Sequence, residues 1–102
     1  MNTCERLAEK NSYSGIMPEL SRFYGIIIRM FYGDHPPPHF HALYQGEEVQ
    51  VDIETLQIIN GRMRGRALGL VLEWSALHRE ELRRAWAAAS QNREPDKIAP
   101  LD

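Results

Sequence analysis

The chain has 102 residues, of which 43% are hydrophobic and 25% are charged, and its formal net charge is -2 with the histidines neutral. These values fit one small globular domain and argue against a general nucleic-acid coat, which needs a strongly basic surface. The one cysteine excludes a disulfide framework within the monomer, and no apolar run is long enough to cross a bilayer, so we expect a cytoplasmic protein with no membrane association.

The first 16 residues are mostly polar, and a Ser-Gly pair interrupts any helix there. We therefore predict a flexible leader over residues 1–16 and one compact domain, with an extended C-terminal tail, over residues 17–102. Within that domain, Phe23–Tyr32 is rich in β-branched and aromatic side chains, which predicts a strand. A glycine and three prolines that follow end this strand.

Three of the four histidines fall between Asp34 and His41, where the chain reads Asp-His-Pro-Pro-Pro-His-Phe-His. The prolines stiffen a loop and exclude a helix. The two-residue period of a strand then places His39 and His41 on one face and Phe40 on the other. We predict a second strand over His39–Tyr44, with both imidazoles on the same side.

Gln45-Gly46 predicts a tight turn into a third strand, Glu47–Ile53. With a two-residue turn, the apolar residues of both strands meet on one face, which supports this register. Residues directly opposite each other have Cβ atoms about 4.5–5.5 Å apart, so an imidazole and a carboxylate are expected to meet on the other face. The predicted pairs are Tyr44 with Glu47, Ala42 with Val49, Phe40 with Val51, His41 with Gln50, and His39 with Asp52.

Leu56–Asn60 predicts a short fourth strand, followed by a loop that carries arginines. From Arg66 to Ser90, apolar residues recur at helical spacing. About 25 residues is long for a globular helix, so a bend near His78 into two helices stays open as an alternative. The predicted fold class is α+β: a small, mainly antiparallel sheet of three to four strands packed against a C-terminal helix or bent helix pair.

Four segments of the chain are distinctive: Met17–Gly25, His35–His41, Asp52–Thr55 and Ala67–Leu82. Together they resemble the bacterial domain-of-unknown-function family numbered 4160, over roughly residues 17–101. The resemblance implies a small prokaryotic protein of a kind often associated with toxin–antitoxin pairs. It brings no established reaction or ligand and no assigned catalytic residue. Family members often carry a glycine where this chain has Leu56, which implies a differently built turn there.

One interpretation of the histidine face is chemistry on RNA or nucleotides by a toxin–antitoxin component. His39 and His41 would transfer protons, because histidine titrates near neutrality, with Asp52 beside them. Arg29 would join the catalytic set and stabilise charge that builds on a phosphate. A second group would bind substrate phosphates: Arg62, Arg64 and Arg66.

A second interpretation is a binding or regulatory protein without catalysis, in which His39, His41 and Asp52 hold a zinc or iron ion. His35 would be a fourth ligand if the proline loop folds back. A third interpretation is structural, with histidines that only bond backbone carbonyls. His78 is expected to be a core histidine or a residue at a helix bend. Free sheet edges also predict a small cognate protein partner or a homodimer.

Overall fold

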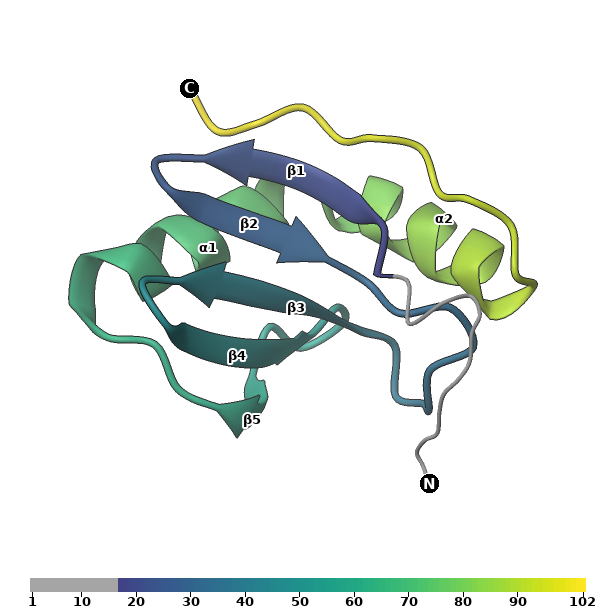
Figure 1. Ribbon diagram of the computed structural model, residues 1–102, viewed down its shortest axis with the longest axis horizontal. Helices are drawn as coiled ribbons and strands as arrows, with labels where there is room; N and C mark the ends of the chain where they lie inside the picture. The colour runs from purple at the N-terminus through teal and green to yellow at the C-terminus, as the bar shows by residue number, and fades with distance from the viewer. Residues whose placement is uncertain (1–16) are drawn as a thin grey trace.

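The computed structural model describes residues 17–102, so the leader predicted over residues 1–16 lies outside the described residues. Five strands form one antiparallel sheet in chain order, and two helices follow (Figure 1). The α+β class is confirmed, with five strands where three to four were expected. The elements are β1 (Glu19–Phe23), β2 (Ile26–Arg29), β3 (His39–Tyr44), β4 (Glu47–Asp52), β5 (Ile58–Gly61), α1 (Gly65–Leu77) and α2 (Arg79–Ser90).

The additional strand arises because the apolar run Phe23–Tyr32 is not one strand. Tyr24 and Gly25 have positive φ values of 51° and 80°, and they reverse the chain between β1 and β2. Glycine takes this conformation without a steric cost, which makes it the residue for the second position of such a turn. After the reversal, Ile26 and Ile28 are fully buried in the core.

The predicted register between β3 and β4 is confirmed at all five pairs. The turn residues Gln45 and Gly46 have φ values of 47° and 82°, which suit a two-residue turn that matches the twist of the strands. On one face, Phe40 and Val51 are fully buried in the core. The alternation of β3 therefore directs its two histidines to the face away from that core.

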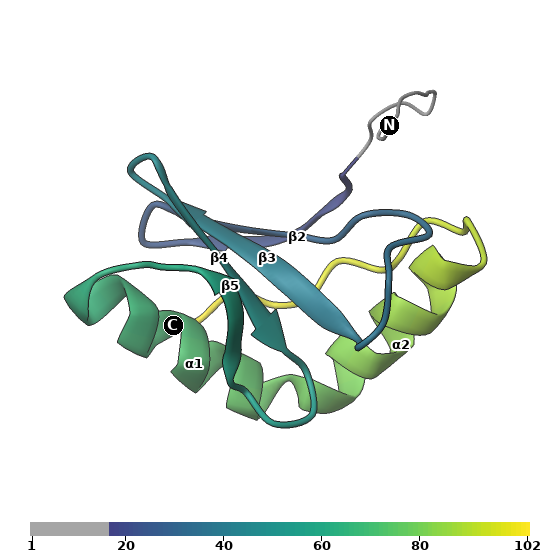
Figure 2. The same cartoon turned by 90° about the horizontal axis from the view of Figure 1, so that it is seen from below.

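Both helices lie on one face of the sheet (Figure 2). They meet at His78, which separates α1 from α2, so the predicted helix bend is confirmed. Trp74 of α1 is fully buried and packs against two rings of the sheet. Its ring centroid lies 5.5 Å from that of Phe23 and 5.9 Å from that of Phe40. This aromatic group fixes the helices against the sheet.

The two edges of the sheet differ. The C-terminal tail runs beside β1 (Figure 1), where the Ile98 N–H donates to the Leu20 carbonyl at 2.8 Å. The opposite edge strand, β5, is exposed along its whole length and presents Ile58 and Ile59 to solvent. Within residues 17–102, neither helix has the length and apolar composition that crossing a membrane requires.

Candidate metal centre

His39 and His41 lie on the same side of β3, as the strand period predicts, but they are buried. Their exposed fractions are 5% and 3%. The ring of His41 meets Phe31 edge-on with 4.8 Å between centroids, and the ring of His39 lies 5.3 Å from that of Trp86. The imidazoles are enclosed at this point, because the segment after β2 and helix α2 both supply aromatic rings that lie against them.

Asp34 is the carboxylate that meets both imidazoles. Its Oδ2 atom lies 2.9 Å from Nε2 of His39 and 3.4 Å from Nε2 of His41. The three residues each offer one ligand atom, and these atoms lie within 4.8 Å of one another. Asp34 comes from the loop between β2 and β3, which the prolines direct back over the start of β3 (Figure 1).

Asp34 belongs to the histidine run, yet its role was not predicted from the sequence. The available signal was its position directly before the prolines. A short stiff loop that returns to the start of a strand brings its first residue close to the first residues of that strand. The strand register predicts only pairs across the sheet, and Asp34 reaches the histidines from a loop outside the sheet.

The second nitrogen of each imidazole is also engaged. Nδ1 of His39 lies 2.7 Å from the Pro37 carbonyl oxygen, which can only accept, so this nitrogen carries a proton and donates it. Nδ1 of His41 lies 2.7 Å from Oε2 of Glu48, and it donates to that carboxylate in the same way. These bonds fix the orientation of both rings and direct both Nε2 atoms to the common point at Asp34.

Asp34 and His39 shift each other's pKa through the hydrogen bond between them. Burial alone would raise the pKa of Asp34, but the hydrogen bonds from His39, His41 and the His35 backbone outweigh it and hold that pKa far below its usual range. The hydrogen bond with Asp34 raises the pKa of His39 against the opposing effect of burial, and the Pro37 carbonyl adds to the rise. A cation is therefore favoured at the place where the three ligand atoms converge.

Asp52 and His35 do not join this cluster. Asp52 is opposite His39 in the register, but its Oδ1 accepts the backbone N–H groups of Glu54 and Thr55 at 2.7 and 2.9 Å. His35 is exposed, and its backbone N–H donates to Oδ1 of Asp34. Of the four metal ligands that the sequence suggested, the structure brings together the two strand histidines, and Asp34 supplies the acid.

The turn that Asp52 organises explains the special position of Leu56. Its φ of 61° lies in the left-handed region that favours glycine, and its N–H donates to the Asp52 carbonyl at 2.8 Å. The turn thus keeps a glycine-like backbone conformation with a leucine in it.

The arginines that the sequence suggested fall into two places. Arg29 is directly opposite His41 in the register of β2 and β3. Arg64 pairs with Glu47 at 3.4 Å, and Glu47 is at the end of β4 opposite to Asp52. The arginines proposed for phosphate binding are all exposed and follow β5, outside the cluster of Asp34 and the two imidazoles: Arg62, Arg64 and Arg66.

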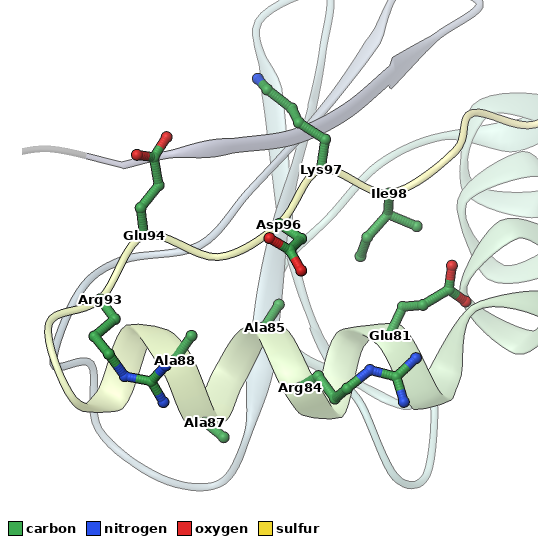
Figure 3. A pocket seen from close by; sticks show the side chains of 10 residues that line it. All are labelled: Glu81, Arg84, Ala85, Ala87, Ala88, Arg93, Glu94, Asp96, Lys97 and Ile98. Atoms are coloured by element: carbon green, nitrogen blue, oxygen red, sulfur yellow. The ribbon is translucent and has the colours of Figure 1, made fainter.

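A groove of about 450 Å³ lies elsewhere, between α2 and the C-terminal tail (Figure 3). Alanines of α2 form its floor, and charged side chains of both signs surround them. None of the histidines lines it. This groove therefore offers no group for the chemistry that the imidazoles, Asp34 and Glu48 make possible.

The fold and the cluster define a small α+β protein with a buried carboxylate–dihistidine group at one end of its sheet. The chain belongs to the family described as Domain of unknown function (DUF4160), whose model matches residues 25–87. This match spans more than half of the chain and includes all three cluster residues. Comparison with the curated proteins and with the solved structures finds no match.

Proposed function

We propose that this protein binds one divalent transition-metal ion, zinc or iron(II), through Asp34, His39 and His41. The observation that carries the proposal is the convergence of both Nε2 atoms on one carboxylate oxygen, while both Nδ1 atoms are held by acceptors. Metal-binding histidines almost always donate their second ring N–H to a carboxylate or a backbone carbonyl. Here Glu48 and the Pro37 carbonyl supply those two acceptors.

The distances support the same conclusion. Two ligand atoms that each lie about 2.0–2.1 Å from a tetrahedral ion are roughly 3.3 Å apart. The Asp34 oxygen lies 2.9 and 3.4 Å from the two Nε2 atoms, which is close to that separation, and the three ligand atoms lie within 4.8 Å of one another. Imidazole nitrogens with one carboxylate suit zinc or iron and suit calcium or magnesium poorly.

Three protein ligands leave at least one coordination position open, which is typical of catalytic sites and not of closed structural sites. The ion would replace the proton that lies between Asp34 and His39 in the metal-free protein. Its charge would also offset the two carboxylates, Asp34 and Glu48, that face the imidazoles.

The geometry favours metal binding over direct proton transfer by the histidines to RNA. A general acid or base must reach its substrate, and the His39 and His41 side chains are only 6% and 4% exposed. The toxin–antitoxin setting in the cytoplasm, with a small cognate partner, is a separate proposal that rests on the family resemblance. Growth arrest on expression, lost in His39→Ala and His41→Ala, would support it.

Elemental analysis of the purified full chain tests the metal proposal. The protein is prepared without a histidine tag, dialysed against zinc or iron(II), and analysed for bound metal per chain. We expect one equivalent in the wild type and less than one tenth of that in Asp34→Asn, His39→Ala and His41→Ala. A tagless preparation matters, because added histidines bind the same ions.

Two matched variants serve as controls. His35→Ala removes an exposed histidine from the same loop, and Asp52→Asn removes the acid that the register alone would select. Both should keep the full equivalent. Metal content that is zero in the wild type, or that is equally retained in the three cluster variants, would overturn the proposal.

A further inference from the structure

Arg29 is a charged side chain of the sheet whose hydrogen bonding is incomplete. Its Nε is buried and has no hydrogen-bond partner among the described residues. The carboxylate opposite it, that of Glu19, is already occupied, because its two oxygens accept from Arg22 at 2.8 and 3.1 Å. A buried donor without an acceptor costs free energy, so this atom is available to an acceptor that enters the site.

Arg29 stands next to the candidate metal centre. The register of β2 and β3 sets it directly opposite His41, with Cβ atoms about 4.5–5.5 Å apart on the same face. Polar residues lie opposite one another in this register on all five strands, and they form one row across the sheet. The row comprises Glu19, Arg29, His41, Gln50 and Asn60.

Solvent reaches this row at Gln50 and Asn60, on the strands that follow β3. A groove of about 260 Å³ is lined there by Glu48, Gln50, Asn60 and Gly61. Glu48 is the same residue that accepts from Nδ1 of His41. A small ligand that enters along the row thus passes the side chain that orients the metal-binding imidazole.

We infer that the centre binds a small oxyanion, a phosphate or carboxylate group, between the metal ion and Arg29. This inference rests on the metal site proposed above. A divalent ion would offset the charges of Asp34 and Glu48, and Arg29 adds a positive charge opposite His41. One oxygen of the anion would fill an open metal position, and another would accept from the unpartnered Nε of Arg29.

Cobalt(II) in place of zinc provides a test without an assumed reaction, because its visible spectrum responds to the ligands around it. Inorganic phosphate and acetate are titrated separately into the cobalt-loaded full chain, which distinguishes the two kinds of oxyanion. We expect a saturable spectral change in the wild type. In Arg29→Gln the affinity for the anion should fall roughly tenfold or more, because a charge-assisted hydrogen bond is lost.

Two further variants keep the test decisive. Arg29→Lys retains the charge but not the planar fork, so its anion affinity should lie between those of the wild type and Arg29→Gln. Arg64→Gln, at the far end of the hairpin, should bind the anion as the wild type does. Circular dichroism confirms that each variant is folded.

The outcomes separate the two proposals. A wild-type protein that takes up no cobalt overturns the metal site and this inference together. A cobalt-loaded wild type with no spectral response to either anion overturns the oxyanion site alone. An equal response in the wild type and Arg29→Gln does the same, and a loss of response in Arg64→Gln assigns the anion to the arginine loop instead.

Discussion

The sequence suggests two groups of candidate site residues, the histidines of β3 and the arginines that face the turn end of the β3–β4 hairpin at Glu47, and the structure holds them in different ways. At the histidine end, each imidazole nitrogen has a partner and the rings are buried. At the arginine end, Arg64 is 83% exposed and its contact with Glu47 is 3.4 Å long. Residues close in sequence become a site when buried partners fix their geometry, and exposed side chains lack that restraint.

Metal removal should give the largest effect that distinguishes the two ends. An ion that binds the folded chain and not the unfolded one stabilises it by about 4 kcal/mol at a free concentration 1,000 times its Kd. We expect the melting temperature to fall on treatment with a chelator and to recover when zinc is added back. Asp34→Asn should melt at the same temperature with and without zinc, and a zinc response in that variant would contradict the assignment.

Gly61→Ala should show that the strand leading into the arginines depends on a close backbone approach to β4. Gly61 has a φ of 73°, and an added Cβ would clash with the Glu48 carbonyl oxygen. We expect a loss of roughly 1–3 kcal/mol in the free energy of unfolding, measured with denaturant. Gly46→Ala is a useful comparison, because its φ is also positive but its Cβ would meet no atom within 4 Å. Equal losses in both variants would show that strain alone, and not the clash, sets the effect.

Glu48→Gln should weaken metal binding without removing a ligand. The carboxylate holds Nδ1 of His41, and loss of such a supporting partner lowers metal affinity by roughly 10–100-fold. The variant should still take up one equivalent at high metal concentration. Competition with a chelator of known affinity measures the change. Glu47→Gln, the neighbouring glutamate that faces Arg64, should leave the affinity unchanged.

The pH dependence of the metal-free protein should follow His39. The hydrogen bond with Asp34 raises the pKa of His39 above its ordinary value of about 6.5. A raised pKa in the folded state contributes stability that is complete below the unfolded value and is lost as pH rises through the folded value. We expect the melting temperature of the chelator-treated protein to fall above about pH 6.5. The slope should flatten in His39→Gln, and an unchanged slope there would exclude His39 as its source.

Arg64→Gln should have the smallest effect on stability. Exposed ion pairs contribute little, because water screens them and both side chains lose freedom. We expect the melting temperature to shift by no more than about 2 °C. A larger shift would show that the arginine end is held by its charges, and the contrast between the two ends would then fail.

The register of β3 and β4 could be predicted because two independent signals agree on it. The Gln45-Gly46 turn fixes the loop length, and the alternation around Phe40 fixes the buried face. The reversal at Tyr24 and Gly25 was not predicted. Because β1 and β2 are both largely buried, the apolar residues continue through the turn, and such a run predicts one strand. The signal of the reversal was the single glycine inside the run.

The candidate site was predictable only in part. The strand period places His39 and His41 together, but the partner acid depends on the path of a loop, which periodicity does not describe. Asp52 fits the register, yet it satisfies backbone N–H groups in its own turn. Asp34 and Glu48 both reach the imidazoles from positions that are not directly opposite His39 or His41. The strand register, which predicts only directly opposed pairs, therefore does not identify either acid.

The contact between Trp86 and His39 has a practical consequence. The indole ring lies 5.3 Å from an imidazole that is protonated in the free protein and would coordinate an ion in the loaded one. Indole emission is quenched by a nearby protonated imidazole, so its intensity should change when a metal displaces that proton. The protein thus contains its own fluorescent indicator, and occupancy of the centre can be followed in dilute solution without any label.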